Sequence, residues 1–254
     1  MYPHYVEYAY LFLLNYYLKI PPRFNKETGL PTTFKGKGTR SANLRDNYPN
    51  RQDGLPKSLK EAIQCFILSI AIRLSRESEL KETPFYHKHH TMLIHISLFA
   101  VWQDRLKILV EDYVKKITEN LNNDGLDAPV WSEFERVWIK HYSYIVNNIK
   151  NHLNSGYNDP YLTPQDFHKD IKILLTEAVK NIEIPSVNSK SGESLDYGKE
   201  PKKYIAIGGN RLSRGFTLEG LTVNYFLRKA NTIDTLMQMG RWFGYRPGYI
   251  DCCK

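Results

Sequence analysis

The sequence predicts an α/β fold in which a parallel β-sheet is flanked by α-helices. Two short apolar runs, residues 204–207 and 222–227, have the length and the β-branched or aromatic content of buried strands. Longer segments with apolar residues at helical spacing alternate with such runs, as over residues 99–121. Alternating strands and helices are typical of a parallel sheet. A chain of 254 residues can also bury one sizeable core, with room for an accessory subdomain.

Residues 1–54 are predicted to form a helix followed by a basic linker. Residues 5–20 are apolar and aromatic, and Pro21 would end a helix there. This stretch is shorter than the roughly 20 apolar residues that a membrane span requires. It also contains Glu7 and Lys19, and it lacks the basic region of a signal peptide. We therefore expect a core-facing helix and no membrane association. The linker that follows has no apolar periodicity and is typical of a long loop.

Residues 55–254 are predicted to form the main α/β lobe. Ser58 and Glu61 have the spacing of a capping box, which would open an apolar-periodic helix through residue 74. The remaining elements, in chain order, are a strand over residues 92–98, helices over 99–121, 130–149 and 164–181, strands over 182–187, 204–207 and 222–227, and a helix over 231–243. The helical stretch at about residues 122–181 is expected to be an insertion in this lobe.

Two polar segments near the C-terminus give the strongest functional signal. The first, RLSRGFTLEGL at residues 211–221, follows a predicted strand, and its glycines allow the backbone to turn tightly beside a ligand. The second, QMGRWFGYR at residues 238–246, places Gln238 and Arg241 on a predicted helix. A guanidinium group is planar and permanently charged, so it binds phosphate oxygens through two parallel hydrogen bonds. These segments therefore indicate phosphate chemistry.

The same residues resemble two motifs of superfamily 2 helicases. Residues 213–225 are similar to motif V, and residues 238–246 are similar to motif VI. A closer resemblance is to the Z1 domain family of predicted endonucleases, whose signatures are nearly intact in both segments. Residues 55–62 and 89–97 are also Z1-like, so the resemblance extends over about residues 53–254.

This resemblance implies a RecA-like parallel sheet and the role of the second RecA-like lobe of an ATPase that acts on DNA, in restriction or phage defence. In such lobes motif V contacts the nucleic-acid backbone and the nucleotide ribose, and motif VI supplies arginine fingers that stabilise charge on the γ-phosphoryl group. The implied nucleic-acid contacts are Arg211, Ser213 and Arg214, the implied nucleotide contacts are Gly215, Thr217, Glu219 and Gln238, and the implied catalytic arginines are Arg241 and Arg246.

The chain contains no P-loop, although a motor of this kind needs the pattern G-x-x-x-x-G-K-[ST] to hold the phosphates of ATP. The nearest match, residues 36–39, has a glycine after Lys37 and no apolar strand before it, which is typical of an ordinary basic loop. The sequence also lacks an Asp-Glu pair for magnesium. We therefore expect ATP and Mg²⁺ to bind together with a first RecA-like lobe, supplied by a missing N-terminal region or by another polypeptide.

The charge of the chain favours a polyanionic partner, which we expect to be DNA. The formal net charge is +8, and a basic excess lies within residues 198–254, together with both motifs. The three cysteines, Cys65, Cys252 and Cys253, form no disulfide framework and fit a reducing compartment. The expected location is therefore the cytoplasm.

Two other functions remain open at this point. One is a module that binds nucleic acid without turnover of ATP, and the other is an endonuclease with an unrecognised active site. Residues 79–81 and 200–202 each match the E-x-K half of a nuclease centre, although the proline in the second is unfavourable in a central strand. Four histidines within residues 87–95 suggest a metal site. His89 and His90 are adjacent and poorly placed to face one ion, so we expect no metal.

Overall fold

The computed structural model describes residues 55–95, 100–123, 128–153, 158–187, 195–208, 218–226 and 247–254. The predicted N-terminal helix and basic linker lie outside these residues. So do the helix predicted over residues 231–243 and most of the two arginine-bearing segments. Within the described part of the chain, no helix has both the length and the apolar character needed to cross a membrane.

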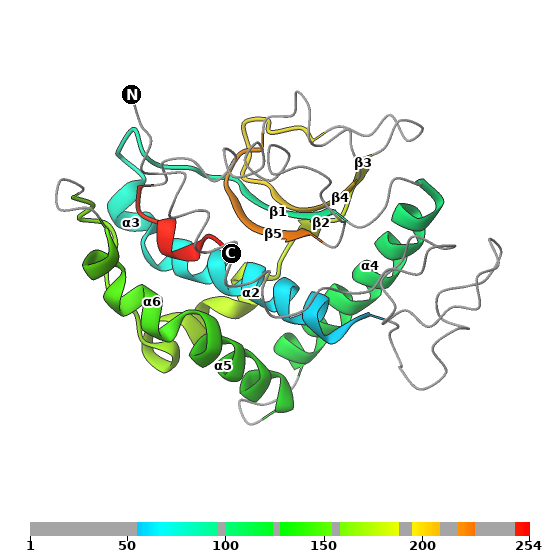
Figure 1. Ribbon diagram of the computed structural model, residues 1–254, viewed down its shortest axis with the longest axis horizontal. Coiled ribbons are helices and arrows are strands. Elements are labelled where there is room, and N and C mark those ends of the chain that lie inside the picture. Colours follow the sequence, from blue (N-terminus) through cyan, green and yellow to red (C-terminus); the bar gives the residue numbers. More distant parts are fainter. Residues whose placement is uncertain are drawn as a thin grey trace.

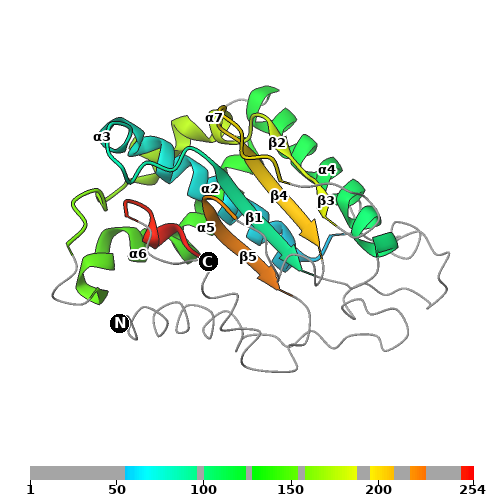
Figure 2. The same cartoon turned by 90° about the horizontal axis from the view of Figure 1, so that it is seen from above.

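A five-stranded, fully parallel sheet forms the centre of the described structure (Figures 1 and 2). Its strands are β1 (His90–His95), β2 (Ile182–Glu183), β3 (Ser186–Val187), β4 (Lys203–Gly208) and β5 (Leu221–Phe226). The order across the sheet is β2, β4, β1, β5, and β3 also pairs with β4. All residues of β1 are buried, as expected for the middle strand of a parallel sheet. The predicted α/β class is therefore confirmed.

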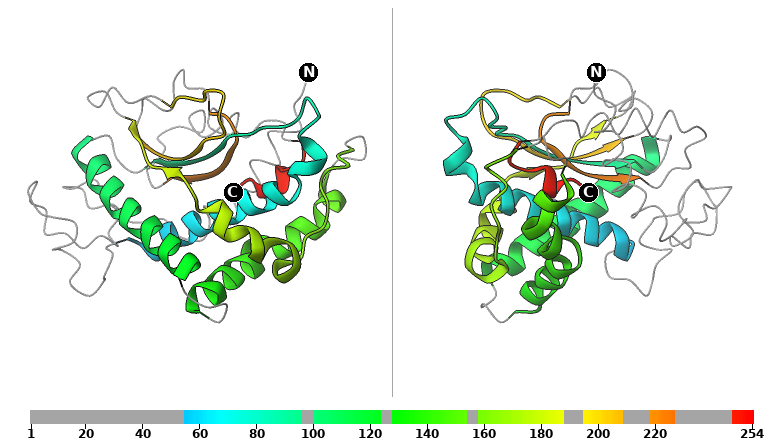
Figure 3. Two further views of the ribbon diagram at one scale, coloured as in Figure 1. Left: turned by 180° about the vertical axis from the view of Figure 1, so that it is seen from behind. Right: turned by 60° about the vertical axis from the view of Figure 1, so that its left-hand side comes forward.

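The α-helices gather on one face of this sheet (Figures 1 and 3). They are α2 (Lys57–Ser75), α3 (Glu77–Leu80), α4 (Ala100–Asn123), α5 (Pro129–His141), α6 (Ser143–Asn148) and α7 (Leu175–Ala178). Shorter turns are 3₁₀-helices at Ile149–His152, Lys172–Leu174 and Ile250–Cys252 and a π-helix at Phe167–Ile171. Both α5 and α7 pack against α2, so the region predicted as an insertion shares its core with the sheet-facing helix.

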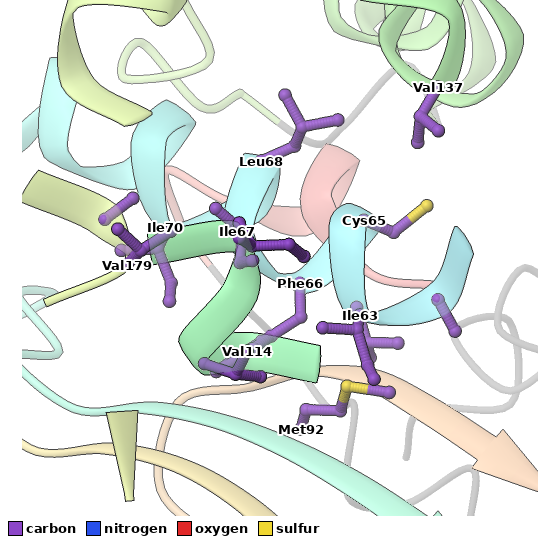
Figure 4. Close-up of a cluster of buried hydrophobic side chains, with 14 of the residues drawn as sticks. Ile63, Cys65, Phe66, Ile67, Leu68, Ile70, Met92, Val114, Val137 and Val179 are labelled. Carbon is purple, nitrogen blue, oxygen red and sulfur yellow. The ribbon is translucent and has the colours of Figure 1, made fainter. Parts of the chain in front are cut away.

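The main hydrophobic core lies between α2 and the sheet. Ile63, Phe66 and Ile70 of α2 are fully buried, and the same cluster includes Met92 of β1 and Val114 of α4 (Figure 4). Each such side chain contributes roughly 1.5–3 kcal/mol by leaving water. Every α2 residue from Glu61 to Arg73 is buried, because the sheet covers one side of the helix and α5 and α7 cover others. On the opposite face of the sheet, a smaller cluster contains Leu93, Val187, Ala206, Leu218 and Leu221.

The predicted capping box at the start of α2 is wrong. The helix begins at Lys57, and its N-cap is Pro56, which makes no side-chain capping bond. Ser58 instead shares a hydrogen bond of 2.8 Å with the hydroxyl of Tyr225 in β5. Glu61 turns toward Lys140 and His141 of α5. Partners on neighbouring elements therefore replace the local pairing that the sequence suggested.

Two helices predicted as continuous are interrupted. The helix predicted over residues 130–149 is divided at Tyr142, whose hydroxyl donates to the carbonyl oxygen of Cys65 (2.8 Å). The helix predicted over residues 164–181 is a succession of π, 3₁₀ and α turns. It starts only after Asp166, whose carboxylate accepts hydrogen bonds from two backbone N–H groups of the first turn. The capping bonds of Asp166 explain the late start of the second helix.

Two predicted strands also differ in their bounds. The strand predicted over residues 182–187 is divided into β2 and β3. Pro185 lies between them, and proline has no N–H to donate to a ladder, although its carbonyl still accepts from Ile207 (2.9 Å). The strand predicted over residues 92–98 begins earlier, at His90, because the backbone N–H of His90 donates to Lys202 (2.8 Å).

Candidate functional site

The carboxyl ends of four strands lie level at one edge of the sheet, which we call the carboxyl edge. His95 ends β1, and in the strand register it lies opposite Gly208 of β4 and Phe226 of β5. Val187, the last residue of β3, also lies opposite Gly208. Figure 2 shows the arrowheads of β1, β4 and β5 pointing the same way. In open parallel sheets, ligands bind outside this edge.

Both arginine-bearing segments leave the sheet from the carboxyl edge. The segment with Arg211, Ser213, Arg214, Gly215 and Thr217 begins directly after β4, and the segment with Gln238, Arg241 and Arg246 follows β5 in the chain. All eight residues lie outside the described part of the chain, so their side chains are not placed. The first segment departs from the carboxyl edge, whereas the second follows β5 but is joined at its C-terminal end to residues that contact Arg73 and Arg76 near the amino edge. The roles of both segments stay predictions.

Glu219 is the one predicted site residue whose position is described. It lies just before β5, at the amino edge of the sheet, which is the edge opposite to the strand ends. Its carboxylate lies 3.6 Å from Nε2 of His89, and its side chain is 44% exposed. Its carbonyl oxygen accepts a hydrogen bond from the hydroxyl of Thr91 (2.6 Å). The length of β5 therefore separates Glu219 from the carboxyl edge.

Three described polar residues lie at the carboxyl edge: His95, considered in the sequence only as a metal ligand, and Ser186 and Asp104, which sequence reasoning missed. His95 is almost fully buried, and its ring packs at a tilt against Phe226 with 5.4 Å between ring centroids. Ser186 at the start of β3 donates a hydrogen bond of 2.7 Å to the carboxylate of Asp104 on α4. The sequence positions of His95 and Asp104 could have marked them as site residues. His95 falls at the end of a predicted strand, and Asp104 falls in the first turns of the helix that follows. Such positions line ligand sites in α/β folds.

The amino ends of two helices also lie near the carboxyl edge. Helix α4 starts at Ala100, shortly after β1 ends, and it has no acidic residue in its first turn. The start of α2 reaches the same edge, since Ser58 bonds to Tyr225, the next-to-last residue of β5. Helix amino ends carry a partial positive charge that favours bound anions. The described geometry is therefore suited to a negatively charged ligand.

The histidines predicted to be ordinary polar residues have protein partners at the amino edge. The guanidinium of Arg73 donates to the carbonyl of His89 (2.9 Å) and to Nδ1 of His90 (2.9 Å), and it stacks over the ring of Tyr249. Burial lowers the pKa of His90 well below its usual range, and the nearby Arg73 charge lowers it further, so His90 is neutral and can accept this bond. Among the described residues, no group of three or more His, Cys, Asp or Glu side chains is placed to hold a metal ion.

The two E-x-K tripeptides lie apart from the carboxyl edge. Glu79 is in the short helix α3, with Lys81 directly after it. Lys202 precedes β4 at the amino edge, where its ammonium group donates to Glu183 at 2.7 Å. Glu200 is exposed. The described part of the chain therefore gives these tripeptides no shared carboxylate site.

A buried ion pair anchors residues 247–254, which directly follow the second arginine-bearing segment. Arg76 donates to both carboxylate oxygens of Asp251, at 2.9 and 2.7 Å, and both side chains are fully buried. Burial alone would lower the pKa of Arg76, but the Asp251 carboxylate raises it above its usual value. Arg76 also donates to the carbonyl of Gly248 (2.9 Å), and the N–H of Gly248 donates to Asp159 (2.7 Å). The chain just after Arg246 is thus fixed to the end of α2.

Comparison of the chain with curated proteins and with solved structures gives no match. A family model does match: that of the Z1 domain, over residues 58–254, which includes the whole described sheet, all the helices on its face and both arginine-bearing segments. On that match over most of its length, the chain belongs to the Z1 domain family.

Proposed function

We propose that this chain is the second RecA-like lobe of a superfamily 2 type ATPase that couples ATP hydrolysis to the processing of DNA, in restriction or phage defence. One observation carries the proposal. The two arginine-bearing segments continue from β4 and β5, which flank β1 on either side and end level with it at the carboxyl edge. Ligands of parallel sheets bind at that edge, and arginine is the side chain best suited to phosphate.

The charge of the reacting phosphoryl group indicates which role each motif residue would have. Phosphoryl transfer spreads negative charge over the equatorial oxygens of the γ-phosphoryl group. Arg241 would stabilise that charge, while Gly215, Thr217 and Gln238 would contact the nucleotide. Glu219 and the chain just after Arg246 lie near the amino edge, so neither Glu219 nor Arg246 is assigned to this site. Arg211, Ser213 and Arg214 would contact the DNA backbone. The described residues do not form a magnesium site, so the ligands of Mg²⁺ and the cradle for the remaining phosphates are assigned to the first lobe.

The anchor at residues 247–254 fixes the C-terminal side of the second arginine-bearing segment at the end of α2, near the amino edge of the sheet. It therefore supports a fixed backbone beside Arg246 but not a position of Arg246 at the carboxyl edge. An arginine finger acts only if the backbone that bears it is held in place, because a misplacement of about 1 Å can cost roughly 10²-fold in rate. The buried pair of Arg76 and Asp251 fixes the chain just downstream of Arg246. The second arginine-bearing segment therefore has a rigid attachment on its C-terminal side.

The test uses the complete two-lobe enzyme, with the first lobe present in cis or in trans. Arg241→Ala should leave nucleotide and DNA binding within a few-fold but lower kcat by roughly 10³ or more, the scale of a finger supplied in trans. Arg241→Lys should fare little better, because it keeps the charge but loses the planar fork. Lys150→Ala, an exposed residue on the helical face, serves as the control and should be neutral. Wild-type ATPase rates in both Arg241 variants, with the fold intact by circular dichroism, would refute the proposal.

A binding module without ATP turnover is the second candidate, and two observations favour it. The sequence has no P-loop, and its formal net charge is +8. DNA binding by the complete protein that is unchanged by ATP would support this function over the motor. Cutting of DNA by this chain alone in the presence of Mg²⁺ would instead indicate an endonuclease.

A further inference from the structure

Described residues of three helices line a groove on the helical side of the molecule. It has a volume of about 570 Å³ and is bounded by the start of α2, the second half of α4 and the start of α5. Leu55, Ile117 and Val130 give it an apolar floor. Its size falls within the range of about 300–1,000 Å³ typical of ligand sites.

Basic side chains stand on all three walls of this groove. They are Lys57 and Lys60 from α2, Lys116 from α4 and Arg136 from α5. Lys57 and Lys116 are exposed, and neither has an ion-pair partner among the described residues. The ammonium group of Lys60 lies 5.5 Å from the centroid of the Tyr113 ring. The groove therefore presents two exposed lysines, Lys57 and Lys116.

The two acidic residues of the groove are already occupied by protein partners. Glu61 is paired with Lys140 and His141, and Arg136 lies 3.9 Å from it. The hydrogen bond to His141, and then that to Lys140, lower the pKa of Glu61 to about 2 against the opposing effect of burial. Glu133 accepts a hydrogen bond from Gln64 at 3.1 Å. The groove lining thus contains four basic and two acidic side chains, and one of the acidic side chains, Glu61, is paired with Lys140 and His141.

The start of α2 adds to the positive potential. The first turn of this 19-residue helix contains no acidic residue, and its N-cap makes no side-chain bond. Acidic side chains normally occupy such a position because they offset the helix dipole, by roughly 0.3–1 kcal/mol each. Lys57 and Lys60 stand there instead. Two cations beside the positive end of a helix interact unfavourably with its dipole, and an anion bound between them would offset this effect.

We propose that this groove binds the phosphodiester backbone of a nucleic-acid strand. The cations come from three separate helices and do not share one wall, which suits a run of phosphates better than a single phosphate group. The start of α2 also contacts β5 through the Ser58 and Tyr225 hydroxyls, so the groove lies next to the carboxyl edge from which the Arg211–Arg214 segment departs. This inference extends the DNA path of the proposed function, on which it rests, and it assigns the strand a second contact surface on the helical face.

The first test compares two double variants of equal charge. Binding of a fluorescein-labelled oligo-dT is followed by anisotropy over a salt series, for Lys57→Gln with Lys116→Gln and for Lys150→Gln with Lys169→Gln. Lys150 and Lys169 are exposed on the helical face, outside the groove. The groove variant should bind roughly 10-fold more weakly at low salt, and its salt slope should fall by about 1.4, or about 0.7 for each lost phosphate contact. The control should change affinity less than about 2-fold. Equal weakening in both variants would overturn the proposal.

The second test maps the contact directly on the unmodified chain. Lysines are acetylated with a water-soluble reagent in the presence or absence of oligo-dT and identified by mass spectrometry. DNA should protect Lys57, Lys60 and Lys116 but leave Lys150 and Lys169 reactive. Inorganic tripolyphosphate at matched ionic strength is the competing probe, and equal protection by it would show a site for free polyphosphate and overturn the strand assignment. If these lysines stay reactive while Arg214→Ala weakens DNA binding, the groove proposal fails and the proposed function stands.

Discussion

At the scale of single residues, the pair of Arg76 and Asp251 is the most consequential interaction in the described structure. Two charges that are fully removed from water are tolerated only when each satisfies the other. Here the guanidinium makes two bonds to the carboxylate and further bonds to the carbonyl oxygens of Gly248 and Thr163. Removing one partner would leave a buried charge without its hydrogen-bonded counterion. The stability of the C-terminal attachment therefore depends on both members of the pair.

Asp251→Ala is expected to lower the free energy of unfolding by about 3–5 kcal/mol, since it strands the buried Arg76 charge. Urea denaturation followed by circular dichroism measures the change. The double variant Arg76→Met with Asp251→Leu should recover much of the loss, because it removes both charges and keeps the volume. Glu177→Ala is a matched control, because it breaks the exposed pair with Lys180 and should cost less than about 1 kcal/mol. A loss in Asp251→Ala no larger than that of the control would contradict the anchoring role.

At the scale of elements, the turn at Gly220 sets how β5 pairs with β1. Gly220 has a φ of 63°, a conformation that is costly for residues with a Cβ. Its carbonyl oxygen accepts from Thr91 (3.0 Å), next to the point where the pairing shifts from Thr91 opposite Leu221 to Met92 opposite Val223. A Cβ atom at Gly220 would also collide with the backbone of His89, the residue just before β1. The register of the edge strand β5 thus depends on one glycine.

Gly220→Ala should destabilise the fold by more than about 2 kcal/mol or prevent folding. An added Cβ would lie 1.8 Å from the carbonyl oxygen of His89, a backbone atom that cannot move aside without disturbing β1. The measurement is the thermal unfolding midpoint, together with hydrogen exchange of the β1 and β5 amides. Gly198→Ala is the control, because its nearest neighbour would be 3.8 Å away. Unchanged exchange in β5 of the Gly220 variant would show that another contact sets the register.

The sequence correctly predicted the strands and helices in which the spacing of apolar residues reflects which side faces the core. Helix α4 and strands β4 and β5 agree with the predicted bounds to within a residue or two, because apolar runs and helical spacing follow directly from which side faces the core. The helix after Asp166 and the break at Tyr142 could not be predicted in this way. Asp166 caps the start of its helix with its own carboxylate, and Tyr142 bonds to Cys65, 77 residues away, so neither interaction leaves a periodic pattern in the sequence.

At the scale of the whole molecule, the edge of the sheet where the candidate site lies could be predicted more easily than the residue pairs that surround the site. Parallel strands followed by Gly- and Arg-rich segments already pointed to the carboxyl edge. The pairing of Ser186 with Asp104 joins residues 82 apart in the chain, and that of Arg76 with Asp251 joins residues 175 apart. Such long-range pairs leave no local pattern in the sequence. The sequence identified candidate functional residues in the two motifs. The contacts that hold the neighbouring chain in place could be found only in the structure.

The last prediction concerns the chain alone and follows from the proposal that the site is divided between two lobes. The purified chain should hydrolyse ATP at a negligible rate, because it contains no P-loop and its described residues form no magnesium site. Arginine fingers have nothing to stabilise until another lobe presents the γ-phosphoryl group. Steady-state release of phosphate, with and without DNA, measures the rate.

Addition of the first lobe should raise this rate, and the increase should be absent with Arg241→Ala. Lys37→Ala is the control for the one glycine- and lysine-rich stretch, residues 36–39, and it should leave every rate unchanged. Strong turnover by the chain alone that is abolished by Lys37→Ala would contradict the prediction. That result would place the phosphate cradle in residues 36–39 and make the chain a complete ATPase, because a lysine reaching the β- and γ-phosphates is what a P-loop supplies.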